Sequence, residues 1–254
     1  MAARYDRVSE VYDETREPLT KDEVDRLADV LRKHKVQSIL EVGVGTGRIA
    51  IPLQERGFDL CGADLSIGML QKARAKGLRN LLLGDANRLP FPERAFDGVV
   101  LAHVIHLLDD PSETFSRLAK VARGYVVAIV RKRDWGVPFP DGSRTKLWEL
   151  VKEAAEAEGY HPPAEDWRKR FRREEEFILS FRPDELLTVG DSEVVTSVGE
   201  RLSLLEKRAY GYPADIPDDA FARIMGKVKS SVDLEREIRY RRIEQVALWH
   251  VDGT

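Results

Sequence analysis

The chain has 254 residues and a formal net charge of −3, with 43% hydrophobic and 33% charged side chains. That length suits one large α/β domain with a well-buried core. The near-neutral charge argues against a general binder of nucleic acid, and no apolar run reaches the roughly 18 residues of a membrane-spanning helix. A single cysteine, Cys61, excludes an intrachain disulfide. We therefore expect a cytoplasmic protein that does not enter a membrane.

The first half of the chain alternates short apolar runs with amphipathic stretches. We expect helices over 20–34, 46–56, 67–77 and 112–124, and strands over 38–42, 59–65, 80–86, 96–105 and 125–133. Thr20 and Glu23 have the spacing of a capping box, and Gly77 is a good residue to end a helix. Strands that alternate with helices in this rhythm predict a doubly wound, mainly parallel sheet.

This rhythm breaks after Lys132. We expect helices over 145–159 and near 218–232, and a last strand over 243–251. We interpret 133–176 and 210–240 as lid or insertion segments on a common sheet. The predicted organisation is an N-terminal helical cap, 1–36, followed by one domain, 37–254. The predicted fold class is α/β, with a Rossmann-like, seven-stranded, mainly parallel sheet, helices on both faces and helical insertions in the C-terminal half.

A glycine-rich loop follows the strand 38–42, in the stretch "EVGVGTGR". A triphosphate loop needs Gly-x4-Gly-Lys-Ser/Thr, and no such lysine follows these glycines. A dinucleotide loop needs a third glycine where this chain has Arg48. Glu41 lies two residues before the first glycine, where it disfavours a pyrophosphate. The loop therefore favours a cofactor with a positive charge and no phosphate.

The spacing of Glu41, Gly43, Gly45 and Gly47 resembles the signature of class I S-adenosylmethionine-dependent methyltransferases. Within that family the likeness is to the type 11 group of ubiquinone/menaquinone-biosynthesis type, and it covers residues 1–132. It implies S-adenosylmethionine as the cofactor. The implied reaction is in-line transfer of the methyl group to an O, N, S or C nucleophile of a small molecule.

Further positions match this family in the expected order, and the resemblance assigns them to the cofactor. Asp64 would bind the ribose hydroxyls, although an Asp here could instead cap the next helix. The remaining cofactor contacts that the resemblance implies are Leu65 and Met69 against the adenine, Asp85 and Ala86 at the adenine amino group, and Ala102 and His103 beneath the methionine part.

His106 would lie on the acceptor side and act as a base, because imidazole can accept a proton near neutral pH. The alternative is that it only lines the pocket, because methyl transfer depends chiefly on positioning. At the N-terminus, Tyr5 and Tyr12 could place a ring near a sulfonium, and Arg16 could pair with the methionine carboxylate. A cap with packed tyrosines and a surface arginine is the other interpretation.

Several features leave alternatives open. The stretch 135–140 and the helix bearing Trp148 are candidates for a lid, or for plain packing. The basic run 167–173 suggests an RNA or protein methyltransferase, but three glutamates follow it and favour a solvated helix. A non-catalytic cofactor-binding module is a further alternative. We expect no metal site, no nucleic-acid partner, and a monomer or homodimer.

Overall fold

A computed structural model describes residues 5–6, 8–134, 147–161, 174, 176–208 and 216–251. The chain divides into two compact units. Unit 1 comprises Met1–Lys132, Trp167–Asp191 and Ile243–Thr254, and unit 2 comprises Arg133–Asp166 and Ser192–Arg242. The boundaries expected from the sequence, 1–36 and 37–254, remain a prediction.

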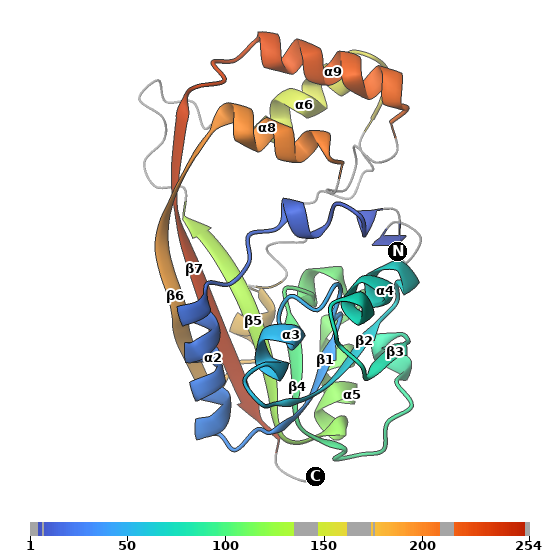
Figure 1. Ribbon diagram of the computed structural model, residues 1–254, viewed down its shortest axis with the longest axis vertical. Coiled ribbons are helices and arrows are strands. Elements are labelled where there is room, and N and C mark those ends of the chain that lie inside the picture. The colour runs from blue at the N-terminus through green and yellow to red at the C-terminus, as the bar shows by residue number, and fades with distance from the viewer. Residues whose placement is uncertain are drawn as a thin grey trace. The chain divides into compact units, whose positions relative to one another are not determined.

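Among the described residues, seven strands form one sheet in the order β3-β2-β1-β4-β5-β7-β6. The first five strands are parallel neighbours. β7 runs antiparallel to β5 (Figure 1), so that the Val251 N–H donates to Gly124 O near the start of β5. The strands are β1 Ser38–Val42, β2 Asp59–Asp64, β3 Leu81–Leu83, β4 Phe96–Ala102, β5 Ala122–Asp134, β6 Glu185–Ser197 and β7 Glu237–His250. This arrangement confirms the predicted Rossmann-like, seven-stranded and mainly parallel sheet.

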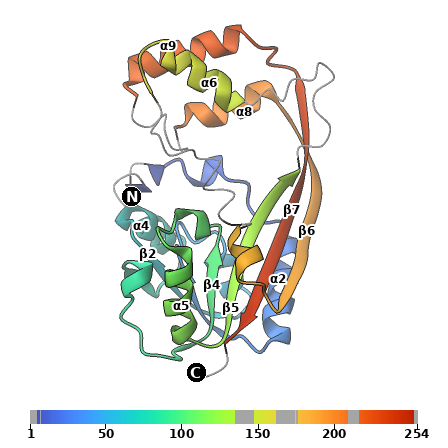
Figure 2. The ribbon, with the colours of Figure 1, turned by 180° about the vertical axis from the view of Figure 1, so that it is seen from behind.

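Helices cover both faces of the sheet in unit 1, as Figures 1 and 2 show from opposite sides. α2 (Lys21–Lys33), α3 (Ala50–Gln54) and α4 (Ile67–Ala75) pack on one face, where Leu27 and Leu53 meet Ile39 of β1 in one apolar cluster. α5 (Pro111–Val121) packs on the other face, where Leu118 joins the next residue of β1, Leu40. Successive residues of the strand therefore enter opposite layers, as a sheet buried on both sides requires.

The expected signals at helix ends are present. Thr20 and Glu23 form the predicted capping box of α2, with the Thr20 N–H donating to Glu23 Oε2 over 2.8 Å. Gly77 follows α4 with φ of +102°, a left-handed conformation that glycine adopts without strain.

The prediction of a helix over 46–56 was wrong at its start, because turns occupy residues 46–49 and α3 begins at Ala50. Gly47 has φ of +81°, and a right-handed helix cannot contain that conformation. The predicted helix 112–124 also ends earlier, since β5 begins at Ala122 directly after α5. β7 begins at Glu237, six positions before the predicted strand 243–251.

Unit 2 has its own apolar core. α6 (Leu147–Glu156), α8 (Val198–Glu206) and α9 (Asp218–Ser230) surround it. Val151, Leu202 and Ile224 are completely buried there. Within the described ranges, no helix has both the length and the apolar character needed to cross a bilayer.

Candidate functional site

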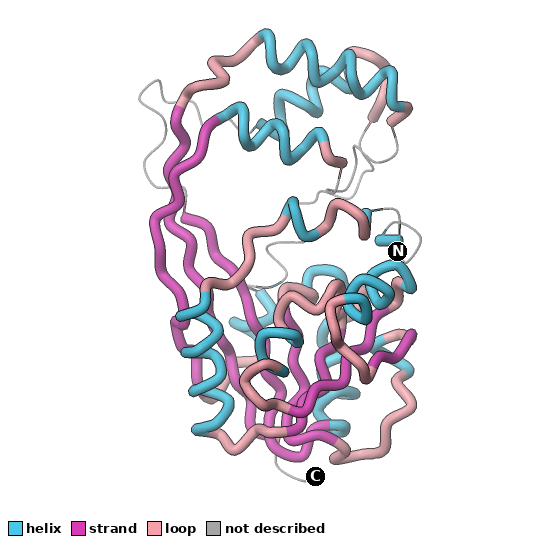
Figure 3. Tube along the Cα trace, in the orientation of Figure 1, coloured by secondary structure: helices cyan, strands magenta, loops and turns pink. Residues whose placement is uncertain are grey.

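The site residues expected from the sequence follow the carboxyl ends of four adjacent strands of unit 1. Residues 43–47 follow β1, Asp64 ends β2 and Leu65 follows it, Asp85 follows β3, and His103 follows β4. Figure 3 shows loops beyond the strands at this edge of the sheet. The strand order reverses between β1 and β4, and a doubly wound sheet binds its ligands at such a point.

Three left-handed glycines shape the first loop. Gly43, Gly45 and Gly47 have φ of +72°, +55° and +81°. A Cβ atom on Gly43 would lie 2.6 Å from a Val104 methyl group, so that position allows only glycine. A Cβ atom on Gly45 would meet nothing nearer than Gly43 O at 4.0 Å. The backbone at Gly45 therefore faces space that the described chain does not fill.

Glu41 lies at the end of β1 and is buried. Burial raises the pKa of this carboxyl to about 8, aided by the nearby Asp64 charge and opposed by a hydrogen bond from the Ala50 N–H. Its Oε2 atom has no hydrogen-bond partner in the described part of the chain. At neutral pH the side chain is therefore largely protonated, and one of its buried oxygens has no hydrogen-bond partner among the described residues.

The carboxylate of Asp64 binds the glycine loop directly. Its Oδ2 accepts the Gly45 N–H over 2.8 Å, and its Oδ1 accepts the Ser66 N–H over 2.9 Å. Burial raises the pKa of Asp64, and these backbone hydrogen bonds partly offset the effect. The cap of α4 is Ser66, whose Oγ accepts the Met69 N–H, and not Asp64. Asp64 therefore links the ends of β1 and β2 at the loop.

Apolar side chains are exposed beside Asp64. Leu65, Ile67 and Leu83 are 44%, 48% and 55% exposed and lie near one another at the ends of β2 and β3. Leu65 was expected at the adenine, whereas Ile67, the first residue of α4, and Leu83, the last residue of β3, were missed. Met69 is buried in the core and exposes almost no surface to a ligand.

Asp85 and Ala86 lie where β3 gives way to the short helix η2 (Ala86–Arg88). Oδ1 of Asp85 accepts the Asn87 N–H over 2.9 Å, which caps this helix. The Ala86 side chain packs against the apolar cluster on the α5 face. The Asp85 carboxylate is therefore held at the same edge of the sheet as Asp64.

His103 has an unusual backbone conformation at the end of β4, next to the buried Ala102. Its φ is +53°, a left-handed value that costs free energy for any residue with a Cβ atom. Its N–H donates to Ile129 O over 2.9 Å, and its Nε2 lies 3.8 Å from Oε2 of the fully buried Glu244. Glu244 in turn pairs with Arg131 of β5. The sequence signals did not find Glu244 or Arg131, because no local motif marks them.

His106 belongs to the short helix η3 (Ile105–Leu107). Its Nδ1 lies 2.7 Å from Oε1 of Glu174, a buried carboxylate 68 positions away in the chain. Such a contact orients an imidazole ring and selects its tautomer. Glu174 was also missed, since it stands at the end of a charged run that predicts a solvated helix.

Hydrogen bonds hold the N-terminal segment against the same loops. Oδ1 of Asp6 accepts the Ser66 hydroxyl over 2.6 Å and the Gly68 N–H over 2.9 Å. Asp13, in the short helix η1 (Asp13–Thr15), accepts the Thr46 hydroxyl over 2.5 Å. Two hydrogen-bonded contacts therefore tie this segment to the loops after β1 and β2.

Tyr12 and Arg16, the N-terminal candidates, contact each other. The Arg16 guanidinium lies 4.7 Å from the centre of the Tyr12 ring, and the Tyr5 and Tyr12 rings meet edge to face at 6.5 Å. Tyr5, Tyr12 and Arg16 therefore form a small aromatic and cationic cluster within the N-terminal segment.

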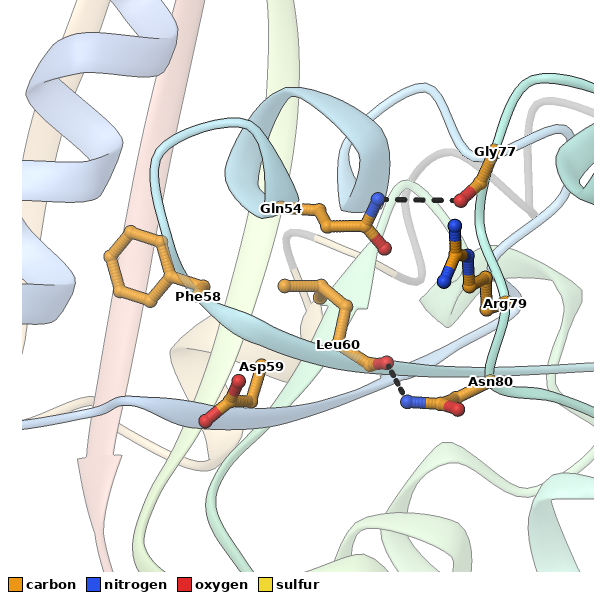
Figure 4. A pocket seen from close by; sticks show the side chains of 7 residues that line it. All are labelled: Gln54, Phe58, Asp59, Leu60, Gly77, Arg79 and Asn80. Atoms are coloured by element: carbon orange, nitrogen blue, oxygen red, sulfur yellow. Dashed lines mark hydrogen bonds between the residues drawn. The ribbon is translucent and has the colours of Figure 1, made fainter.

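A surface hollow of about 380 Å³ lies at the opposite edge of the sheet, at the start of β2 (Figure 4). Its polar side chains are engaged locally, with Asn80 Nδ2 donating to Leu60 O and Gln54 Nε2 donating to Gly77 O. The hollow is therefore not the predicted site. Across the described ranges, no group of three His, Cys, Asp or Glu side chains could hold a metal ion. The lid stretch 135–140, the Trp148 side chain and the run 167–173 lie outside what the structure describes.

Comparison with known proteins finds methyltransferases. Residues 40–128 match a family model described as a methyltransferase domain. A demethylmenaquinone methyltransferase from Renibacterium salmoninarum is 29% identical over 129 residues, which cover 48% of this chain and 54% of that protein. A malonyl-[acyl-carrier protein] O-methyltransferase from Salmonella typhimurium is 29% identical over 164 residues, covering 64% of this chain and 63% of that protein. The matches thus span less than two thirds of either relative.

Solved structures resemble the fold over nearly the whole chain. A protein from Anaeromyxobacter dehalogenans, described as a candidate type II methyltransferase, superposes with a TM-score of 0.55 at 16% identity. The superposition covers 94% of this chain and 99% of that one. At this identity the likeness concerns the fold alone.

Proposed function

We propose that the protein transfers a methyl group from S-adenosylmethionine to a small-molecule acceptor, because residues 40–128 match the family model of a methyltransferase domain. The observation that carries the proposal is the pair formed by Gly45 and Asp64. The loop backbone at Gly45 faces space that the described residues leave open, and the Asp64 carboxylate accepts its N–H over 2.8 Å.

The residues at this edge fit the chemical groups of that cofactor. The exposed side chains of Leu65, Ile67 and Leu83 offer an apolar surface for the flat adenine. The Asp64 and Asp85 carboxylates supply acceptors for hydroxyl and amino groups. The buried Oε2 of Glu41 lacks a partner in the described chain, as expected of a group that meets a ligand.

When bound, S-adenosylmethionine supplies a methyl group on a positively charged sulfur. The chain contributes positioning, because in-line displacement needs the acceptor atom held behind that methyl group. The His103 N–H donates to Ile129 O, which holds the end of β4 against β5. The Tyr12 ring and the Arg16 guanidinium form the side of the site that the N-terminal segment provides, where an aromatic face stabilises a cation.

His106 is the candidate general base, and Glu174 positions it. When Glu174 accepts the Nδ1 proton, Nε2 carries the lone pair that takes a proton from the acceptor. A Glu174→Ala variant should shift the histidine tautomer, and nitrogen NMR of the His106 ring measures this without any acceptor. An unchanged ring spectrum would leave His106 without a positioning partner.

The test of the cofactor is a calorimetric titration with S-adenosylmethionine, S-adenosylhomocysteine and NADH. We expect micromolar binding of the two sulfur compounds and none of NADH. Asp64→Asn should weaken binding at least tenfold, since it removes the charge from the acceptor of the Gly45 N–H. Asp59→Asn is the matched control, because Asp59 is exposed at the other end of the same strand.

Two other functions predict different results. An RNA or protein methyltransferase would bind polyanions in a salt-sensitive way, which a gel-shift series in rising salt detects. A non-catalytic module would bind both sulfur compounds and never turn over across a panel of oxygen, nitrogen, sulfur and carbon acceptors. Failure of both sulfur compounds to bind would end the methyltransferase proposal.

A further inference from the structure

Two arginine side chains from different parts of the chain meet at one carbonyl oxygen. Arg48 follows the glycine loop, and its Nη2 donates to Glu17 O. Arg131 lies near the end of β5, and its Nη1 donates to the same oxygen over 3.0 Å. Two guanidinium groups that share one acceptor repel each other, and the carboxylates of Glu17 and Glu244 offset this repulsion only on the Arg131 side.

Arg131 is held rigidly and retains an unused donor. Its side chain is only 8% exposed. Its Nε pairs with the buried Glu244, and its Nη1 lies 3.4 Å from Oε2 of Glu17. Its Nη2 is buried and, in the described part of the chain, has no acceptor. A guanidinium fixed in this way presents a preorganised hydrogen-bond donor.

Arg48 forms no direct ion pair in the described part of the chain, although the charge of Asp13 acts on it. Among the described residues, no Asp or Glu oxygen lies within ion-pairing distance, and the Glu17 carbonyl is its hydrogen-bond acceptor. Burial lowers the pKa of Arg48, and the charges of Arg131 and Arg16 add to that effect, whereas Tyr12 and Asp13 oppose it. Arginine stays charged even so, so the chain keeps a half-buried positive charge in an unfavourable setting.

We propose that Arg48 and Arg131 form an anion site that binds a carboxylate or phosphate group of the methyl acceptor. The inference rests on the proposed function and names the substrate class, a small anionic molecule. Guanidinium groups suit both anions, because their fork of N–H donors matches two oxygens at once.

The position of the site favours the acceptor over the cofactor. Arg48 directly follows the glycine loop, but Arg131 lies on β5, one strand beyond the strands β1 to β4 whose loops are proposed for the cofactor. Arg16, which lies against the Tyr12 ring, is the residue that the resemblance assigns to the methionine carboxylate of the cofactor. The pair Arg48 and Arg131 is therefore additional to what the cofactor requires.

The experiment uses the protein saturated with S-adenosylhomocysteine, which fills any cofactor carboxylate site. Inorganic phosphate and succinate are titrated into it by calorimetry, with succinamide as the uncharged probe. We expect both anions to bind and succinamide not to bind. Arg48→Gln should weaken anion binding at least tenfold, the loss expected for a charge-assisted hydrogen bond. Arg48→Lys should retain part of it.

Arg117→Gln is the matched control, since Arg117 is an exposed arginine of α5 paired with Glu113. It should leave anion binding unchanged. Thermal unfolding of each variant checks that it is folded, and Arg48→Gln should unfold near the wild-type temperature because it breaks no ion pair in the described chain.

Two results would overturn the inference. In the first, the loaded protein binds neither anion, or Arg48→Gln binds them as well as the wild type. In the second, Arg48→Gln loses affinity for S-adenosylhomocysteine but keeps its affinity for 5′-methylthioadenosine, which lacks the carboxylate. That pattern would assign the site to the cofactor. If S-adenosylhomocysteine does not bind at all, the proposed function fails, and the same anion titrations on the protein alone still decide the site.

Discussion

At the scale of single residues, Gly45 combines backbone strain with nearby open space. A Gly45→Ala variant should lose about 1 kcal/mol of folding free energy, because φ of +55° is left-handed, yet its Cβ atom meets no clash. The methyl group would occupy the space proposed for the cofactor, so affinity for S-adenosylhomocysteine should fall at least tenfold. Calorimetry and thermal unfolding measure the two effects.

Gly57→Ala separates backbone strain from loss of the ligand. Gly57 has φ of +90° and nothing within 4 Å of its Cβ position, but it lies in the turn before β2, at the other edge of the sheet. It should lose a similar folding free energy and keep wild-type affinity. Equal affinities for both variants would contradict the placement of the cofactor at Gly45.

Glu41 makes the stability of the protein depend on pH. Its pKa rises from 4.5 in the unfolded chain to about 8 in the fold, so the folded state holds an extra proton between those values. The contribution of Glu41 to the free energy of unfolding is therefore fully present below pH 4.5 and is lost as the pH rises toward 8. The Glu41→Gln variant mimics the protonated form. Its free energy of unfolding should therefore exceed that of the wild type by a margin that grows by a few kcal/mol across that window.

Denaturant unfolding of both proteins at several pH values measures this gain. The difference between variant and wild type isolates Glu41 from the other titrating groups. A difference that stays constant between about pH 5 and 8 would show that Glu41 is ionised in the folded protein.

At the scale of elements, the N-terminal segment before α2 depends on a few polar contacts. It is mostly loop in Figure 3, and Asp6 holds it to Ser66 and Gly68 at the start of α4. These hydrogen bonds lower the pKa of Asp6, so the anchoring carboxylate is ionised at neutral pH. The segment carries Tyr12 and Arg16, which makes its position relevant to the proposed cofactor.

Asp6→Ala should release this segment without unfolding the sheet. We expect faster amide exchange over residues 8–18 and weaker binding of S-adenosylhomocysteine, with little change in the exchange of β1 and β4. Glu10→Ala is the control, because Glu10 holds the same segment only through an exposed ion pair with Lys72, and such pairs contribute little. Unchanged exchange in Asp6→Ala would show that other contacts hold the segment.

At the scale of the whole molecule, the two units have separate apolar cores. One set of clusters contains Leu27, Leu40 and Leu118 of unit 1, and another contains Leu202 and Ile224 of unit 2. All the residues proposed for the cofactor and the anion belong to unit 1. A ligand should therefore stabilise unit 1 directly, because it binds only where that unit is folded.

Calorimetric unfolding tests this expectation. S-adenosylhomocysteine at about one hundred times its dissociation constant should add about 2.7 kcal/mol and raise the midpoint of unit 1 by several degrees. Amide exchange should slow in β1 and β4 more than in α9. NADH is the negative control. Equal protection of α9 and β4 would show that the units unfold together.

The sequence predicts those features that short spacings encode. The alternation of strands and helices, the capping box at Thr20 and Glu23, and the glycines beside Glu41 depend on neighbours a few positions apart. A left-handed glycine or an N-cap is a local requirement of the backbone, so these features could be predicted from the chain alone. Parallel strands then bring Asp64 and Asp85 to the same edge of the sheet as the loop.

The tertiary structure decided the pairs that join distant positions. Glu174 lies 68 positions from His106, and Glu244 lies 113 positions from Arg131. Neither acid stands in a motif, and only the folded chain brings each one to its partner. The order β4-β5-β7 brings the acid of one strand against the arginine of another. Pairs of this kind form only in the folded chain, so the local pattern of residues does not predict them.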